Sequence, residues 1–251
     1  MKLRRIIILA YLYVPYCLHK ITGTGAFGRH QGENIDGPIQ SDGNSLKSAL
    51  IKHHVKQFHE SSCSVASVVS VVNAIRDEQG DTPMPVSQMD ILEKVRTANW
   101  KERMSKKGHN GKRGLPLPVL SEVVKSSLEA YGIEYKAFET IQAQKNSKQS
   151  EGIKEVLWKR LNDFEKKGDC LIIAHFDQGA YVPTLNIPHI SPVGGFDTQN
   201  GDVTILDVDP LQEKPYKITF DTFYKGLSSN YHHFFRPFGF GSGGYVFIKL
   251  R

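Results

Sequence analysis

Segments typical of helices precede segments typical of strands along this chain, and this order restricts the folds that it can adopt. Five segments have the apolar spacing or the start and stop signals of helices: Ser45–Phe58, Cys63–Asp77, a segment that begins after Pro85, Leu117–Tyr131 and Glu151–Lys167. Five later segments are apolar runs separated by turn residues, as in strands: Cys170–Phe176, Ile190–Phe196, Val203–Val208, Tyr216–Phe220 and Tyr245–Leu250. Helices followed by a mostly antiparallel sheet predict an α+β domain.

Composition and charge exclude several classes of protein. The 251 residues are 39% hydrophobic and 23% charged and include three cysteines, which excludes a disordered chain and a disulfide-rich miniprotein. The sequence has no run of about 18 apolar residues, so it predicts no integral membrane domain. The net charge of +6 is mildly basic. Since no segment interleaves aromatic residues with clustered lysine and arginine, we expect no nucleic-acid partner.

The N-terminus has the pattern of an export signal. Residues 1–5 (MKLRR) are basic, residues 6–16 (IIILAYLYVPY) are apolar, and a small-residue cleavage pattern ends at Ala26. These features favour export to the periplasm over the alternatives, a buried N-terminal strand or a short membrane anchor. The chain then divides into a signal peptide over residues 1–26, a flexible segment over residues 27–44 and one domain over residues 45–251.

A cysteine stands at the start of the second predicted helix. Ser61 and Ser62 are candidate N-caps, so Cys63 would lie in the first turn, where the helix dipole favours a thiolate. Backbone N–H groups at a helix start can also bind an oxyanion, and Gln57 could supply a second donor from its side-chain amide. Cys63 is therefore a candidate nucleophile. The alternative is a small buried side chain at the end of a valine-rich helix face.

A candidate base and its partner lie in the strand-forming half. His189 precedes an apolar strand, and Asp207 lies 18 positions later at the end of the next one. A hairpin that turns through residues 197–202 would bring the two side chains to the same end of the sheet. A cysteine that opens a helix, followed by histidine and aspartate on a sheet, is the arrangement of papain-like enzymes. His175 is an alternative base without a carboxylate at hairpin distance, and Asp197 is an alternative carboxylate expected in the turn.

Three segments resemble the phytochelatin synthase family. They are QFHESSCSVASVVSVVNAI, CLIIAHFDQGAYVP and HISPVGGFDTQNGDVTILDV, compared with family patterns of the form Q-x5-C-G-x-A-S…V-L-N-A and G-H-F-S-P-I-G-G-Y…L-I-L-D-V. The resemblance covers most of residues 45–250 and implies a papain-like fold, in which an N-terminal helical lobe packs its nucleophile helix on a C-terminal antiparallel sheet. By position, it implies these roles: nucleophile for Cys63, base for His189, orienting acid for Asp207 and oxyanion donor for Gln57.

The resemblance also implies a reaction for a short, prokaryotic-type member of the family. Cys63 would attack glutathione, release glycine and form a γ-glutamylcysteinyl thioester. The acyl group would pass to water, which hydrolyses glutathione, or to a second glutathione, which makes a phytochelatin. The partners implied are glutathione and related γ-glutamyl thiols, and a homodimer is a compatible assembly. No tightly bound cofactor is expected, and a divalent heavy metal such as Cd²⁺ or Zn²⁺ would enter as a thiolate complex of the substrate or as an activator.

Two functions compete with this one. The first is a papain-like peptidase that cleaves larger peptides, such as leader sequences, with the same residues. It needs an open groove, whereas a γ-glutamyl donor needs a tight, charged site. The second is a non-catalytic protein that binds thiols or metal. The complete set of Gln57, Cys63, His189 and Asp207 argues against it.

The sequence departs from the family pattern at two informative places. Ser64 stands where the family usually has glycine after the nucleophile, so the turn there is expected to differ slightly. Gly243-Gly244 stands before the last strand where Arg-Gly is common in the family. The loss of that arginine leaves open which residues bind the carboxylates of the substrate.

The remaining reactive side chains have simpler interpretations. No metal site is predicted, because no C-x-x-C or H-E-x-x-H motif accompanies the two groups of histidines, which are His53, His54 and His59, and His232 and His233. Cys170 begins an apolar strand and is expected to be buried and inert, although in an exported protein it could form a disulfide with Cys63. The basic segment from Lys101 to Gly114 is expected to be a solvated loop rather than a binding patch.

Overall fold

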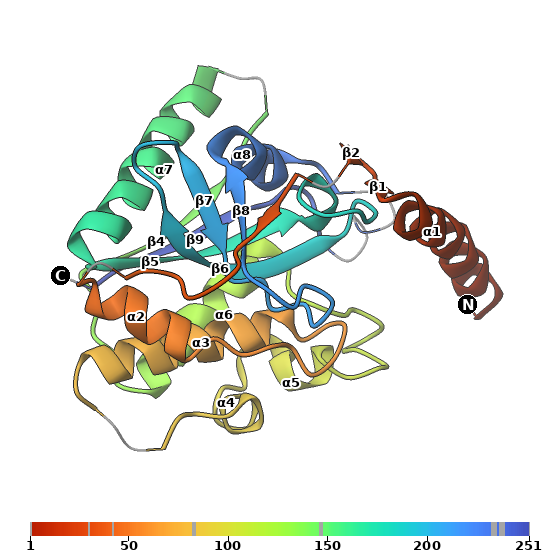
Figure 1. Ribbon diagram of the computed structural model, residues 1–251. Coiled ribbons are helices and arrows are strands. Elements are labelled where there is room, and N and C mark those ends of the chain that lie inside the picture. Colours follow the sequence, from red (N-terminus) through yellow and green to blue (C-terminus); the bar gives the residue numbers. More distant parts are fainter. Residues whose placement is uncertain are drawn as a thin grey trace.

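A seven-stranded antiparallel sheet forms the centre of the computed structural model (Figure 1), which describes residues 2–29, 31–41, 43–81, 84–145, 148–231, 235 and 239–250. The strand order is β3-β8-β7-β6-β5-β9-β4, and every neighbouring pair is antiparallel. The strands are β3 (Glu33–Asn34), β4 (Ala137–Gln142), β5 (Cys170–Asp177), β6 (Pro188–Phe196), β7 (Asp202–Ile205), β8 (Tyr216–Thr219) and β9 (Gly244–Lys249). Together with the helices, this sheet confirms the predicted α+β class.

The predicted helices that begin at Cys63, Leu117 and Glu151 end within one residue of where the sequence placed them. The predicted helix from Ser45 is shorter than expected and ends at Lys52, because the chain turns away there toward the nucleophile helix. The helices of the domain are α2 (Ser45–Lys52), α3 (Cys63–Glu78), α4 (Gln88–Lys94), α5 (Trp100–Arg103), α6 (Leu117–Ala130), α7 (Lys148–Lys167) and α8 (Phe220–Ser228), with short 3₁₀ turns at Thr97–Asn99 and Gln178–Ala180.

These helices cover both faces of the sheet. In Figure 1, α2, α3 and α6 lie on one side of it, and α7 and α8 lie on the other. Every residue of β5 is therefore buried, as expected for a central strand with helices on both faces. α3 packs on the sheet and contacts the helices α2, α4 and α6, and its residues from Cys63 to Ile75 are all buried. The predicted packing of the nucleophile helix on an antiparallel sheet is confirmed.

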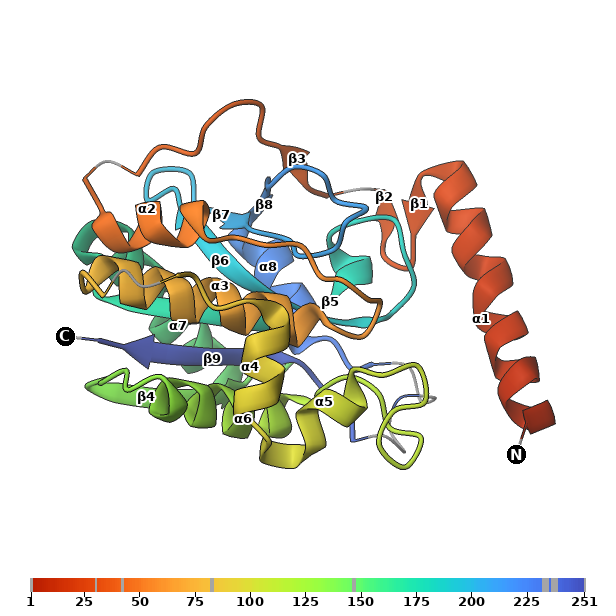
Figure 2. The ribbon, with the colours of Figure 1, turned by 90° about the horizontal axis from the view of Figure 1, so that it is seen from below.

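The N-terminal helix stands apart from the domain. α1 (Lys2–Thr22) projects away from it in both views (Figures 1 and 2) and exposes apolar side chains, among them Tyr13 and Ile21. Among the described residues, no helix is long and apolar enough to cross a membrane. A signal peptide over residues 1–26 stays a prediction.

The segment after α1 is hydrogen-bonded to the domain, where the sequence predicted a flexible segment over residues 27–44. A small hairpin, β1 (Thr24–Gly25) with β2 (Gly28–Arg29), comes first. The backbone N–H of Gln31 then donates to the Tyr181 carbonyl at 3.0 Å, and β3 pairs with β8 as an edge strand. Backbone hydrogen bonds hold this stretch to the domain. Such bonds need no alternation of apolar residues, so the sequence pattern did not predict them.

Candidate active site

The turn before α3 places Cys63 as the first residue of the helix. Ser62 is the N-cap, as one of the two candidates predicted, but its hydroxyl binds the turn rather than the helix. It accepts from the His59 N–H at 2.9 Å and donates to the His59 carbonyl at 2.8 Å. Cys63 is 8% exposed, so its thiol lies in a nearly closed site at the positive end of the helix dipole.

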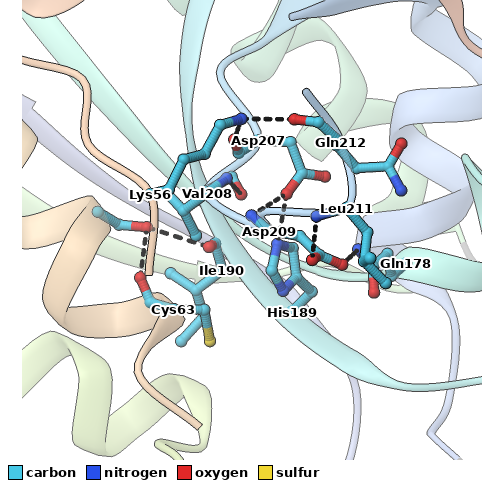
Figure 3. Close-up of polar contacts among 12 residues, drawn as sticks. Lys56, Cys63, Gln178, His189, Ile190, Asp207, Val208, Asp209, Leu211 and Gln212 are labelled. Atoms are coloured by element: carbon cyan, nitrogen blue, oxygen red, sulfur yellow. Dashed lines mark hydrogen bonds and ion pairs between the residues drawn. The ribbon is translucent and has the colours of Figure 1, made fainter. Parts of the chain in front are cut away.

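The hairpin of β6 and β7 brings the predicted base and carboxylate together. The pairing register shifts between Val193 and Gly195, which marks an irregularity or β-bulge in this hairpin. His189 Nε2 lies 2.7 Å from Asp207 Oδ1. Figure 3 shows the two side chains pointing toward each other. The predicted proximity of these two side chains is confirmed. Because Nε2 is occupied by the carboxylate, Nδ1 is the ring nitrogen left for proton transfer.

Asp207 is held by three hydrogen-bond donors. Besides His189, its Oδ1 accepts from the Asp209 N–H at 2.8 Å, and its Oδ2 accepts from the Tyr216 hydroxyl at 2.8 Å. Complete burial acts to raise the pKa of Asp207, but the charge of His189 and these hydrogen bonds outweigh it and hold the pKa below its usual value. Asp207 is therefore a carboxylate, although no part of its side chain is exposed.

His189 is stabilised in its charged form. Burial acts to lower its pKa, but the Asp207 charge, the hydrogen bond to Asp207 and the neighbouring Cys63 thiol together raise the pKa well above its usual value. A charged imidazole beside a cysteine at a helix N-terminus is the pairing of an acid–base residue with a nucleophile that cysteine-dependent enzymes use. The arrangement can therefore supply a nucleophile and a proton donor at once.

A buried serine fixes the nucleophile helix against the strand that carries His189. The hydroxyl of Ser67 lies 2.8 Å from the Cys63 carbonyl and 3.0 Å from the Ile190 carbonyl, so it joins α3 to β6 next to the site. The sequence analysis did not single out Ser67. The sequence did offer one signal: Ser67 stands in the stretch Cys-x-x-Ala-Ser, one helical turn after Cys63 and therefore on the same face of the helix.

Gln57 lies on the loop that crosses the end of β7. Its backbone N–H donates to the Val208 carbonyl at 2.8 Å, and its side-chain Oε1 is buried without a hydrogen-bond partner among the described residues. The neighbouring Lys56 extends along the same edge and donates to the carbonyls of Asp207 at 2.6 Å and Gln212 at 2.5 Å. The loop is thus attached to the strand end that carries Asp207. The role of Gln57 as oxyanion donor stays a prediction.

The alternative base and carboxylate are both engaged elsewhere. His175 is fully buried, with Nδ1 2.8 Å from the Tyr231 hydroxyl and Nε2 3.0 Å from the Leu115 carbonyl. Burial lowers the pKa of His175 to about 4, so this ring is neutral. Asp197 lies in the β6–β7 turn, where it accepts from the N–H groups of Gln199 and Asn200. Neither side chain contacts Asp207 or His189 through a hydrogen bond among the described residues.

The other histidines and cysteines that the structure describes are not gathered into a second reactive centre. No cluster of three or more potential metal ligands exists within the part of the chain that the structure describes, and His232 and His233 lie outside it. Cys63 and Cys170 are both free. Burial raises the pKa of Cys170 to about 12, as expected for an inert thiol. Cys170 lies at one end of β5, and the residue that pairs with His189 lies near the other end, about 20 Å away along the strand. Cys170 is therefore too far from the site to form a disulfide with Cys63.

The serine after the nucleophile has a partner of its own. Ser64 is completely buried, and its hydroxyl accepts from the indole N–H of Trp100 at 3.0 Å. The residue that departs from the family pattern therefore connects the first turn of α3 to α5.

Replacing Ser64 by alanine is expected to lower the free energy of unfolding by about 1–3 kcal/mol, because the Trp100 N–H is left buried without an acceptor. Ser64→Gly should cost about 1 kcal/mol more, because glycine is a poorer helix former. Urea unfolding measures both. If Ser64→Ala is as stable as the wild type, this hydrogen bond does not contribute to stability.

Comparison with known proteins agrees with this site. A family model described as phytochelatin synthase matches residues 38–234, which is more than half of the chain. The chain belongs to the phytochelatin synthase family. The matched range contains Gln57, Cys63, His189 and Asp207. A search of curated proteins found no match. Membership of this family supports glutathione γ-glutamylcysteinyltransferase-like activity in general, and hence an acyltransferase.

Proposed function

We propose that this phytochelatin synthase family member forms a γ-glutamylcysteinyl thioester on Cys63 from glutathione. The observation that carries the proposal is the buried Cys63–His189–Asp207 arrangement, in which the carboxylate keeps the imidazole charged beside a thiol. Cys63 and His189 are only 8% and 5% exposed, which favours a small donor over a long peptide that needs an open groove.

In the first half-reaction, the Cys63 thiolate attacks the carbonyl carbon of the cysteinyl–glycine peptide bond. The carbonyl oxygen becomes an oxyanion, for which the N–H of Cys63 and the Gln57 amide are the proposed donors. His189 gives its Nδ1 proton to the glycine nitrogen as the carbon–nitrogen bond breaks. Glycine leaves, and the acyl group stays on sulfur as a thioester.

In the second half-reaction, the neutral His189 takes a proton from the acceptor. Water as acceptor gives γ-glutamylcysteine, and the α-amine of a second glutathione gives a phytochelatin with a new peptide bond. In either case the carbon–sulfur bond breaks and Cys63 leaves as a thiolate beside the imidazolium. Asp207 keeps the ring in one orientation through both proton transfers.

The remaining parts of the proposal concern metal and location. The chemistry described above needs no bound cofactor, and Cd²⁺ or Zn²⁺ would enter as a thiolate complex of glutathione or as an activator. Export to the periplasm and a homodimer stay predictions, each testable on the expressed protein by its N-terminal mass and its mass in solution.

The proposal is tested by incubating the purified protein with glutathione under reducing conditions, with and without Cd²⁺, and identifying products by mass spectrometry. We expect γ-glutamylcysteine and glycine, with longer oligomers if transfer occurs, and a loss of at least about 10⁴-fold in Cys63→Ala. A trapped γ-glutamylcysteinyl adduct on Cys63 would show the thioester directly.

Intact glutathione in every condition would overturn the proposal. Cleavage of a peptide library by the same protein would then indicate the competing peptidase. Product formation that persists in Cys63→Ala would contradict the assignment of the nucleophile.

A further inference from the structure

The Asp207 carboxylate shares one of its oxygens between two donors. His189 Nε2 lies 2.7 Å from Oδ1, and the backbone N–H of Asp209 donates to the same oxygen at 2.8 Å. The position of the Asp209 peptide therefore affects where Oδ1 lies relative to the imidazole. Whatever holds residue 209 in place thus bears on the geometry of the His189–Asp207 pair.

Residue 209 lies in an exposed turn that follows β7. The side-chain Oδ1 of Asp209 accepts from the Leu211 N–H at 2.9 Å, and its carbonyl accepts from the Gln212 N–H at 3.0 Å. Leu211 is 61% exposed, so the turn has little apolar packing at its tip. The hydrogen bonds inside the turn set its shape, but its position on the domain depends on contacts with other elements.

The side chain of Gln178 supplies such a contact. Its Nε2 lies 3.0 Å from Asp209 Oδ2, and Figure 3 shows the two groups pointing toward each other. Because a carboxylate can only accept, the amide presents its NH₂ group, and a hydrogen bond to a charged acceptor is stronger than one to a neutral group. Gln178 is 7% exposed, so water has little access to compete for this bond.

Gln178 is itself fixed by its backbone. It is the first residue of a 3₁₀ turn directly after β5, and its N–H donates to the Ile187 carbonyl at 3.1 Å. Ile187 stands two residues before His189, so this bond closes the segment that connects β5 to β6. The Gln178–Asp209 bond therefore ties the segment that leads to His189 to the turn that follows Asp207.

A second anchor holds the ends of this turn. Lys56 donates to the carbonyls of Asp207 and Gln212, which lie on either side of residue 209 in the chain. Loss of the Gln178 bond would leave these ends attached and would free residue 209 between them. The expected consequence is a displaced Asp209 N–H, and hence a changed carboxylate–imidazole pair, rather than an unfolded domain.

We propose that Gln178 is a positioning residue for the Asp207 carboxylate. Through its bond to Asp209 it holds the Asp209 N–H on Oδ1 of Asp207, so that Oδ1 stays directed at Nε2 of His189. The inference rests on the proposed function, in which Asp207 keeps the imidazole in one orientation through two proton transfers. Gln178 itself takes no part in these transfers.

The test exchanges the two partners of this bond. Gln178→Glu sets a second carboxylate against that of Asp209, and at pH 8 their repulsion should displace residue 209. We expect kcat for glutathione to fall about 10- to 100-fold and KM to change less than about threefold, because the orientation of the imidazole matters in the transition state. Adding Asp209→Asn should return kcat to within about threefold of the wild type, since the new amide donates to the new carboxylate.

Gln212→Glu is the matched control. It places the same charge on the same turn, and the contact of Gln212 with Lys56 is made by the backbone carbonyl, which the substitution keeps. Its kcat should stay within about twofold of the wild type, because a charge on this exposed turn is screened. An equal loss in Gln212→Glu would mean that the added charge, and not the broken contact, lowers the rate.

A spectroscopic readout separates positioning from a general loss of stability. The Nε2 proton of His189, shared with Asp207, should give a low-field NMR signal that is identified by its absence in His189→Gln. In Gln178→Glu this signal should move upfield, because a longer hydrogen bond deshields the proton less. It should return to its wild-type position when Asp209→Asn is added.

This signal needs no substrate, so it also separates the inference from the proposed function. If the wild type does not turn over glutathione but the signal moves in Gln178→Glu and returns with Asp209→Asn, the proposed reaction is wrong and the positioning role stands. An unmoved signal overturns the role, whatever the turnover. So does an unchanged kcat in an active enzyme, an equal loss in Gln212→Glu, or a double variant that does not recover. If Gln178→Glu does not fold, Gln178→Leu gives the same decision, because it removes the donor without adding a charge.

Discussion

Replacing His189 by glutamine is expected to reduce kcat/KM for glutathione by about 10⁴-fold or more. Glutamine can still donate a hydrogen bond to Asp207, but it cannot carry the proton that the leaving glycine requires. The positive charge that His189 places beside Cys63 is lost as well, since the Asp207 charge raises the pKa of the imidazole and favours its charged form. Steady-state rates with glutathione, normalised to folded protein, measure the effect.

His175→Gln is the matched control, because His175 is also buried, on the strand next to that of His189. Its ring is neutral and occupied by Tyr231 and Leu115, so this variant is expected to lose stability and to keep kcat per folded molecule within about tenfold. If the two variants lose activity equally while both keep the wild-type circular dichroism spectrum, His189 has not been distinguished as the base.

The core of the site was predictable because each of its parts is locally encoded. Cys63 opens a helix after two serines, and the hairpin that pairs His189 with Asp207 turns through a sequence rich in Asp, Asn and Gly. Both strands are buried runs that meet at this turn, so the turn indicates where their pairing begins. Once the hairpin was placed, the 18-residue separation of the two side chains put them at the same end of the sheet.

The elements that the sequence analysis missed are held by partners distant in the chain. β4 pairs with β9 along its whole length, although its residues are mostly half-buried or exposed and lack the alternation of a covered strand. α8 follows β8 directly. The predicted strand Tyr216–Phe220 ends at Thr219, whose hydroxyl accepts from the Thr222 N–H and caps the helix. β4 has no local signal that distinguishes it from a loop, whereas the Thr219 cap of α8 is a local signal that the sequence analysis did not use.

The supporting residues of the site were unpredictable for the same reason. Tyr216, which donates to Asp207, lies on β8, and its role depends on β8 lying beside β7. Lys56 reaches two carbonyls that are brought to it only by the fold. A polar contact between residues far apart in the chain has no characteristic spacing in the sequence. It can be predicted only when the strand order is known.

Asp207→Asn is expected to lower kcat/KM by about 10³- to 10⁴-fold, because the amide presents a donor as well as an acceptor and no longer fixes the charge and orientation of His189. The charge of Asp207 contributes most to raising the pKa of His189, so this pKa is expected to fall in the variant. The alkaline limb of the pH profile of kcat/KM, where the imidazolium is lost, should therefore move to lower pH. Asp202→Asn, at the other end of β7, is the control and should leave both the rate and the profile unchanged.

The same substitution should alter stability in a defined pH window. The pKa of His189 is raised on folding, so its contribution is complete below its unfolded pKa of about 6.5 and is lost as pH rises through the folded value. The pKa of Asp207 is lowered, so its contribution is complete above its unfolded pKa of about 3.8 and is lost as pH falls through the folded value. The gap in free energy of unfolding between wild type and Asp207→Asn should thus be widest between about pH 4 and 6.5 and narrower at pH 9. Urea unfolding at pH 5, 7 and 9 measures it, and a gap that is constant across these values would mean that the pair is not charged in the folded protein.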